Sequence, residues 1–271
     1  MTVTSVLWEH RDFQGFTRTV STGSSRYRWM RYGSQANDEL SSERAWGIGQ
    51  RGHAFAFEHR DFAGRFSALN VDNGGSSWWS YYGGAFNDTV SSSIVVAREQ
   101  AAREVELGLR DLIAPRFTDL FDSETEGTRL SRRGDPRVYG TFFPSWDLDR
   151  VFVTIDQDLR VDVPDWFDYD AEVRYYIAFF VAADGILGAR AVRSSVWVEG
   201  GVLSSTIMNR IKGRLHGAKP LITRALEAQI ALLGRLRFAD VYLLPGQRPD
   251  FELAGYFGTN EDDVTLVAVR R

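Results

Sequence analysis

A six-residue motif that occurs twice constrains this chain more than any other feature. One copy is Asn37-Asp38-Glu39-Leu40-Ser41-Ser42, and the other is Asn87-Asp88-Thr89-Val90-Ser91-Ser92. Each copy follows an upstream companion that reads Glu-His-Arg-Asp-Phe, at residues 9–13 and 58–62. Self-similarity at a fixed spacing indicates that one supersecondary unit is repeated. The sequence therefore predicts a first domain over residues 1–98, built from two copies of one unit.

Short apolar segments separated by Gly, Ser and Asn fill both copies, and this pattern is typical of an all-β sandwich. The expected strands are residues 3–9, 16–20, 27–32, 45–48, 54–57, 65–70, 78–82 and 93–97. After the first strand of each copy we expect a hairpin that folds back on the sheet. Its two aromatic residues would pack together, and its Gly would adopt a backbone angle that other residues resist. These residues are Trp8, Phe13 and Gly15 in one copy and Phe57, Phe62 and Gly64 in the other.

The two motifs together resemble a known family. The pattern aromatic-x4-aromatic-x-Gly, followed by Asn/Asp-Asn/Asp-x-x-Ser/Thr-Ser, is similar to that of the calcium-binding βγ-crystallin domain. Both motifs occur twice, in order and at similar spacing, and the resemblance covers residues 1 to about 98. It implies two Greek keys that form one sandwich with two calcium sites at one end.

The resemblance also implies the ligands of those two Ca²⁺ ions. Calcium prefers hard oxygen ligands such as carboxylates, hydroxyls and backbone carbonyls, and each loop offers all three. The implied side-chain ligands are Asp38, Ser41, Asp88 and Ser91. The implied backbone carbonyls are those of Glu9, Glu39, Glu58 and Thr89. In the family each site draws on both motifs, so the two sites would lie close together.

Other residues of the motif have expected structural roles. Ser42 and Ser92 are expected to hydrogen-bond the folded hairpins, while Leu40 and Val90 point into the core. The alternative interpretation is that both loops are only turns, because Asn, Asp and Ser are common turn residues.

Three further patterns in this domain have simpler explanations than the functions they suggest. Residues 47–52 match a dinucleotide-binding fingerprint, but a strand-like segment follows where that motif requires a helix. Residues 26–32 interleave arginines with aromatics, as a strand with solvated arginines also would. His10 and His59 lie in expected exposed turns without partner residues, so we interpret them as surface residues.

Composition sets broad limits on function. With 271 residues, 44% hydrophobic and 25% charged, the chain is typical of a soluble protein of one large or two ordinary domains. The net charge of −4 argues against a nucleic-acid partner, and the absence of cysteine excludes thiolate sites and disulfides. No apolar run could span a bilayer, and the N-terminus lacks the features of a signal peptide. Cytoplasmic and secreted locations both stay open.

Residues 99–271 contain no repeat and predict an α+β domain of unknown role, with antiparallel strands and a long helix. We expect a helix over 98–112, a loop over 123–136 and an antiparallel meander of strands over 151–163, 173–183 and 186–198. A long helical element, or a pair, is expected over 203–233. Closing strands follow at 238–244 and 264–269, separated in part by a loop over 255–263.

The chemistry of this second part is sparse. Acidic residues gather between Asp147 and Glu172, but alternation along the strand places Asp156, Asp158 and Asp162 on a solvated face. A carbohydrate-acting enzyme that uses these carboxylates is therefore the less favoured hypothesis. The order of elements loosely resembles the tubular lipid-binding superfamily. An apolar ligand or lipid, bound between residues 175–181 and the long helix, is thus an alternative to a solid core.

The leading hypothesis is a calcium-binding βγ-crystallin module, with structural or regulatory Ca²⁺, fused to this second domain. The sequence leaves the oligomeric state, the calcium affinity and any coupling between the domains open.

Overall fold

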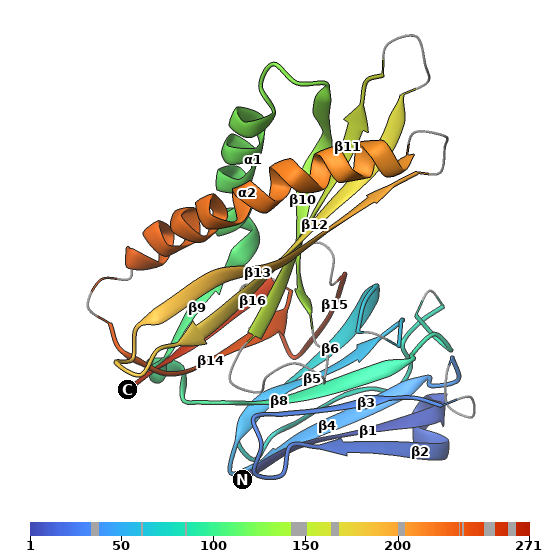
Figure 1. Ribbon diagram of the computed structural model, residues 1–271. Coiled ribbons are helices and arrows are strands. Elements are labelled where there is room, and N and C mark those ends of the chain that lie inside the picture. The colour runs from blue at the N-terminus through green and yellow to red at the C-terminus, as the bar shows by residue number, and fades with distance from the viewer. Residues whose placement is uncertain are drawn as a thin grey trace. The chain divides into compact units, whose positions relative to one another are not determined.

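The computed structural model is mostly β, with several antiparallel sheets and a few helices (Figure 1). It describes residues 1–33, 38–60, 62–84, 86–141, 151–163, 168–199, 204–232, 234, 236–246, 253–259 and 264–271. Within these ranges, none of the helices combines the length and apolar character needed to cross a bilayer. The chain divides into two compact units. The first unit holds Met1–Glu104 and Pro245–Glu261, and the second holds Val105–Leu244 and Asp262–Arg271.

The first unit contains every strand expected from the repeat. Their bounds are β1 Thr2–His10, β2 Gln14–Ser21, β3 Tyr27–Arg31, β4 Ser42–Ile48, β5 Arg51–Phe57, β6 Arg65–Val71, β7 Ser76–Trp79 and β8 Ser92–Arg98. Only β7 is clearly displaced, since it begins and ends earlier than the expected 78–82. Periodicity located these strands because each is short and bounded by turn residues.

The two copies exchange their third strands. One sheet has the order β2-β1-β4-β7, and the other has the order β15-β6-β5-β8-β3. Thus β3 of the first copy pairs antiparallel with β8 of the second, while β7 of the second pairs antiparallel with β4 of the first. Side chains from both sheets, such as Leu7 and Ala56, form one buried cluster with Leu40 and Val90 from the two motifs. Neither copy can complete its sheet or its core without the other.

A strand from the far end of the chain extends the second sheet. β15 (Gly255–Thr259) pairs antiparallel with β6, so the expectation of a loop over 255–263 is wrong for these residues. A Cβ atom on Gly258 would stand 2.6 Å from the Phe66 ring, so only glycine allows this approach. The glycines that suggested a loop instead lie in this strand, where they allow close packing against neighbouring aromatic rings.

The segment after the repeat is a strand and a helix. β9 (Glu104–Gly108) follows a short 3₁₀ helix, η2 (Ala101–Arg103), and α1 covers Leu109–Thr125. The expected helix over 98–112 is therefore wrong up to residue 108, because the apolar spacing was read across a strand–helix boundary. α1 continues through Pro115, whose missing N–H removes one helical hydrogen bond.

The second unit is built on a four-stranded antiparallel meander. β10 (Leu130–Thr141), β11 (Val151–Val161), β12 (Tyr169–Val181) and β13 (Leu187–Val198) pair in chain order. This confirms the expected meander but adds β10, where the sequence suggested a loop. The register shifts between Arg133 and Arg137, so a bulge absorbs the Gly-Asp-Pro segment that resembled a turn. Asp147, Asp149 and Asp165 lie outside the described residues.

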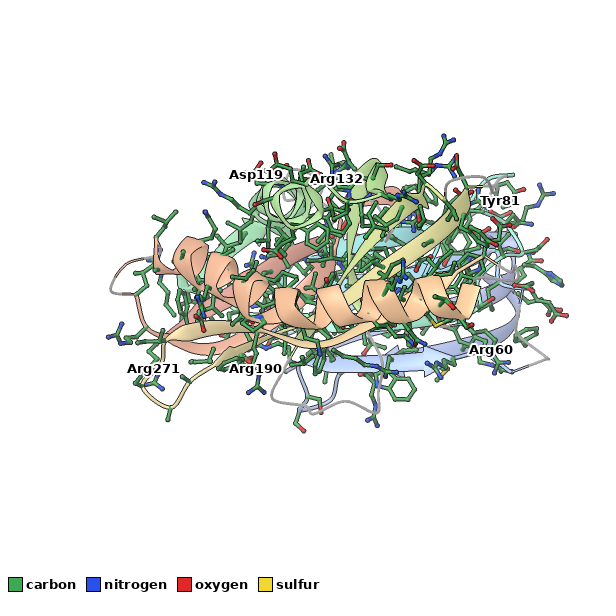
Figure 2. The ribbon with its side chains drawn as sticks, turned by 45° about the horizontal axis from the view of Figure 1, so that its top comes forward. Arg60, Tyr81, Asp119, Arg132, Arg190 and Arg271 are labelled. Carbon is green, nitrogen blue, oxygen red and sulfur yellow. The ribbon has the colours of Figure 1, made fainter. Side chains whose placement is uncertain are left out.

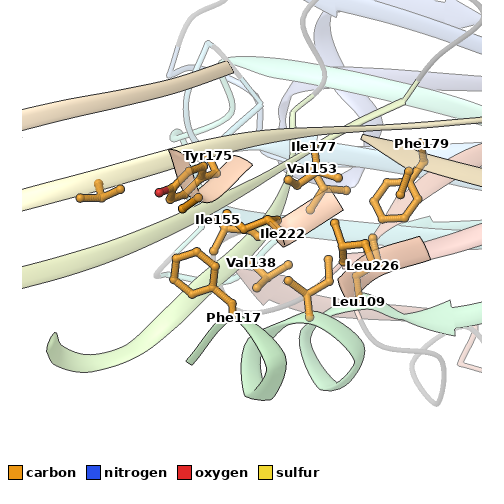
Figure 3. Packing of buried hydrophobic residues seen from close by; sticks show 14 of the residues in the cluster. Leu109, Phe117, Val138, Val153, Ile155, Tyr175, Ile177, Phe179, Ile222 and Leu226 are labelled. Carbon is orange, nitrogen blue, oxygen red and sulfur yellow. The ribbon is translucent and has the colours of Figure 1, made fainter. Parts of the chain in front are cut away.

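Two helices cover the apolar core of this unit. α2 (Ser204–Ala231) is one helix that passes through Pro220, and β14 (Phe238–Pro245), β16 (Val264–Arg270) and β9 form a further sheet. Figure 3 shows Phe117 of α1 and Ile222 of α2 packed against Ile155 and Tyr175 of the meander. Leu203 lies outside the described residues, as does the side chain of Leu215.

A small cavity remains where α1, α2 and the meander meet. It is lined by apolar residues that include Phe117, Tyr175 and Ile211, and its volume is about 20 Å³. That volume is room for about one water molecule. This cavity is too small for a lipid.

One acidic residue of β11 is not solvated as expected. Asp158 and Asp162 are exposed, but the Asp156 side chain is only 3% exposed. It faces Arg137 on one neighbouring strand and Arg174 on the other. The Arg174 guanidinium donates to both carboxylate oxygens of Asp156, at 2.6 and 2.9 Å, and the Tyr139 hydroxyl donates at 2.6 Å. By contrast, Figure 2 shows the exposed Asp119 and Arg190 pointing away from the ribbon.

We expect Asp156→Ala to lower the free energy of unfolding by about 3 kcal/mol, because it removes the buried carboxylate that binds Arg174 and Tyr139 and leaves Arg174 with the Glu172 carboxylate alone. Asp158→Ala, the matched control on the same strand, should cost less than about 1 kcal/mol, since Asp158 pairs with Arg137 at an exposed position. Urea unfolding followed by circular dichroism measures both. Equal losses in the two variants would contradict a structural role specific to Asp156.

Candidate metal centre

A folded hairpin follows the first strand of each copy. In the first copy the short 3₁₀ helix η1 (Arg11–Phe13) turns the chain, and Gly15 adopts a φ of 83°. The Trp8 and Phe13 rings meet edge to face with centroids 5.1 Å apart. Phe57 and Phe62 do the same in the second copy at 6.0 Å, and Gly64 has a φ of 75°. The expected hairpin geometry is confirmed; Asp61 lies outside the described residues.

The end of each six-residue motif is tied to the hairpin of its own copy. The Ser42 hydroxyl donates to the His10 carbonyl at 2.7 Å, and the Ser92 hydroxyl donates to the His59 carbonyl at 2.6 Å. This confirms the role expected for both serines. Leu40 and Val90 are fully buried, as expected. The hairpins thus hold the two loops in place before any ligand binds.

Each six-residue motif also forms hydrogen bonds with the motif of the other copy. The Ser41 hydroxyl donates to Oδ1 of Asp88 at 2.8 Å, and the Ser91 hydroxyl donates to Oδ1 of Asp38 at 2.9 Å. We call these the Asp88–Ser41 pair and the Asp38–Ser91 pair. The backbone reinforces the exchange, since the Asp38 amide donates to the Val90 carbonyl at 3.2 Å. The structure therefore groups the four predicted side-chain ligands into two pairs, each with one residue from each copy.

Both aspartates have the same unusual backbone. The φ angle is 60° at Asp38 and 56° at Asp88, in the left-handed region that asparagine and aspartate tolerate better than most residues. Each carboxylate lies at the surface, while Ser41 and Ser91 are buried beneath. Each pair therefore presents one exposed carboxylate beside a fixed hydroxyl.

The spacing of each pair suits a shared Ca²⁺ ion. Two oxygens that each lie about 2.4 Å from Ca²⁺ are about 3 Å apart when they are neighbours in its coordination shell. The Ser–Asp separations of 2.8 and 2.9 Å match that value.

Asn87 adds a further acceptor beside Asp88. Its amide nitrogen donates to Oδ2 of Asp88 at 2.5 Å. Its Oδ1 is buried and has no hydrogen-bond partner among the described residues. An acceptor without a donor, next to a carboxylate, is an environment that favours a cation. Asn37, at the matching place in the first motif, lies outside the described residues.

The side chains of the two hairpin glutamates serve the hairpins. Oε2 of Glu9 accepts from the Phe16 amide at 3.2 Å. Glu58 accepts from the Arg65 amide and guanidinium, and the Arg65 hydrogen bond holds the pKa of Glu58 below its usual value. The roles implied for Glu9 and Glu58 are those of their backbone carbonyls, which these contacts do not involve.

The two mid-loop ligands implied by the resemblance are also carbonyls. Glu39 is exposed, and the Thr89 hydroxyl donates to the Phe86 carbonyl at 2.8 Å. In the described part of the chain, no group of three or more His, Asp or Glu side chains is placed to hold a metal. Each pair contributes one carboxylate, so its other ligands would have to be hydroxyls, carbonyls and water.

A buried carboxylate beneath the loops was not anticipated from the sequence. Glu43 is fully buried and accepts hydrogen bonds from the Ser5 hydroxyl at 2.6 Å and the Tyr82 hydroxyl at 2.9 Å. Burial raises the pKa of Glu43 to about 7, although these hydrogen bonds oppose the shift. Ser93 occupies the matching place in the second copy and bonds to Tyr32 at 2.7 Å. The sequence does show that the first motif is followed by Glu43 and the second by Ser93, and this difference could have indicated a special role for Glu43.

A buried histidine was missed as well. His53 on β5 is bonded to Asn70 and, at 2.9 Å, to Arg98, which also pairs with Glu104 at 2.7 Å. Burial lowers the pKa of His53 well below its usual value. No motif in the sequence marks this residue.

The simpler explanations for the three other patterns are confirmed, except that Arg26 is half-buried and donates to the Ala97 carbonyl at 3.0 Å. His10 and His59 are exposed, and residues 47–52 cover the turn between β4 and β5. Residues 27–31 form β3, whose Arg28 and Arg31 are exposed.

Comparison of the chain with protein-family models, with curated proteins and with solved structures finds no match in any of the three.

The buried Glu43 predicts a pH-dependent stability. The folded protein keeps the proton until about pH 7, whereas the unfolded chain releases it near pH 4.5. Between these values the folded state keeps the proton on Glu43, so the contribution of Glu43 to the free energy of unfolding should fall as pH rises, by about 3 kcal/mol in all. The lowered pKa of His53 has the opposite effect in every variant, so the contribution of Glu43 is the difference between wild type and Glu43→Gln. Glu43→Gln, which cannot ionise, should lose this fall, while the exposed control Glu126→Gln should keep it. Urea unfolding between pH 4.5 and 8 measures the effect; identical profiles for wild type and Glu43→Gln would contradict it.

Proposed function

We propose that the first unit is a calcium-binding domain of the βγ-crystallin type, in which Ca²⁺ has a structural or regulatory role. The reciprocal Asp38–Ser91 and Asp88–Ser41 pairs carry this proposal. They bring together the four side-chain ligands that the resemblance implies, at a separation suited to one ion per pair.

The fold of the first unit supports the same proposal. Exchange of β3 and β7 between the sheets is what two intertwined Greek keys would produce. The exchange also explains why each proposed site draws on both copies. The second unit would be an α+β partner on the same chain, with a role that its residues do not specify.

The proposed sites carry little charge. One aspartate per ion, with hydroxyl and carbonyl ligands, suggests an affinity on the order of micromolar or weaker. Each ion would join loops that are far apart in the sequence, so binding would favour the folded unit. At a free Ca²⁺ concentration of about 100 times Kd, one site would add about 2.7 kcal/mol of stability.

The two rival hypotheses gain no support from the described residues. The apolar cavity of the second unit is about 20 Å³, far below the size of a lipid. Among the strand carboxylates, Asp156 is engaged by Arg174 and Tyr139, and Asp158 is paired with Arg137. Ion pairs of this kind occur widely as structural features of β-sheets.

Calorimetric titration of the full chain with Ca²⁺ tests the proposal. We expect saturable binding near two ions per chain, abolished in Asp38→Ala/Asp88→Ala because each site loses its only carboxylate. Asp72→Ala, which removes an exposed aspartate from another loop of the same unit, is the matched control and should bind like wild type. An absence of binding by the wild type at millimolar Ca²⁺ would refute the proposal.

The pairing itself makes a second prediction. Because Ser41 lies against Asp88, Ser41→Ala should weaken the site that Asp88→Ala abolishes. Ser41→Ala should therefore have no further effect in the Asp88→Ala background, but should weaken the remaining site in the Asp38→Ala background. The same titrations measure this. The reverse result would mean that each site takes its serine and aspartate from one motif.

A further inference from the structure

The loop that carries Asp88 is packed against β15, the strand contributed by the far end of the chain. Phe86, two residues before Asp88, meets Phe257 of β15 edge to face, with ring centroids 5.7 Å apart. Phe86 is only 4% exposed. This contact lies within the first unit and connects a proposed calcium loop to residues 245–261.

The conformation of this loop depends on Phe86. The Phe86 and Asn87 amides both donate to the Gly83 carbonyl, at 3.2 and 2.9 Å, and the Phe86 carbonyl accepts from the Thr89 hydroxyl. The Phe86 ring also packs edge to face on Tyr82 at 5.2 Å. Asp88 sits in the left-handed region, which costs energy unless neighbouring contacts maintain it. Packing of Phe86 therefore helps to place the Asp88 carboxylate.

The position of Phe257 depends on the pairing of β15 with β6. It pairs with Ser67 in the ladder between β15 and β6, and its ring packs against Trp79 with centroids 4.8 Å apart. Its side chain is nevertheless 48% exposed. If β15 left β6, Phe257 would leave Phe86 with it.

The first copy has no matching support in the described part of the chain. β2 corresponds to β6 in the repeat, and β2 is an edge strand of its sheet. β15 therefore makes the two copies inequivalent, and it contacts the loop that carries Asp88.

We propose that Phe257 is a positioning residue for the Asp88–Ser41 site, so that calcium binding there and pairing of β15 with β6 stabilise each other. This inference rests on the proposed calcium-binding function. The two sites are then inequivalent, with the Asp88–Ser41 site preorganised by β15. Coupling of this kind is reciprocal, so occupancy of that site also strengthens the attachment of β15.

β15 lies between β14 and β16 in the sequence, and both of those strands belong to the second unit.

Single-site backgrounds of the full chain test the role of Phe257. In Asp38→Ala, which retains the Asp88–Ser41 pair, Phe257→Ala should weaken Ca²⁺ binding roughly threefold to tenfold, the range expected for losing one aromatic pair. In Asp88→Ala, which retains the other pair, Phe257→Ala should leave the affinity unchanged. Val20→Ala, a buried change in a separate cluster of the same unit, controls for general loosening and should affect both backgrounds alike.

The outcomes are distinguishable by calorimetry. A wild type that does not bind Ca²⁺ overturns the proposed function and this inference together. Calcium binding that Phe257→Ala leaves intact in both backgrounds, or weakens equally in both, overturns the coupling alone.

Hydrogen exchange tests the reciprocal effect without a change in β15. Saturating Ca²⁺ should slow exchange of the β15 amides, residues 255–259, in the wild type and in Asp38→Ala, but not in Asp88→Ala. This measurement stands even if Phe257→Ala fails to fold. The same protection in Asp88→Ala as in wild type would overturn the coupling.

Discussion

Exchange of the third strand between two copies of one unit is the constraint on which the first unit depends. Because β3 completes the sheet of the second copy and β7 that of the first, each copy supplies what the other lacks. The same exchange brings the two six-residue motifs side by side. The pairs formed by Ser41 with Asp88 and by Ser91 with Asp38 follow from that arrangement. The proposed metal centre therefore depends on the way in which the two copies pair with each other.

The two copies differ in two respects, one at Glu43 and the other at β15. Glu43 stands where the second copy has Ser93, and it places an ionisable group beneath Tyr82. β15 extends the sheet beside β6, and nothing matches it beside β2 in the described residues. Two sites that look alike in sequence thus have different surroundings. The proposal therefore expects the two sites to differ in calcium affinity and in coupling to β15.

Asp156 and Glu43 are both buried carboxyl groups, but their partners differ. In the second unit, Asp156 accepts hydrogen bonds from the Arg174 guanidinium and the Tyr139 hydroxyl. In the first unit, the hydrogen-bond partners of Glu43 among the described residues are hydroxyls, and burial raises its pKa to about 7. Because the unfolded chain releases this proton at a lower pH, Glu43 makes the stability of the fold depend on pH.

The sequence by itself determined the features whose cause is local. Strand positions and the hairpin aromatics and glycines follow from short-range patterns, and so does the antiparallel meander of the second unit. Tertiary structure alone decided which residues meet across the chain. It placed β15 against β6, buried Asp156 between two arginines and paired Ser41 with Asp88. Periodicity indicates which face of a strand a residue occupies. Residues on other elements of the chain determine what covers that face.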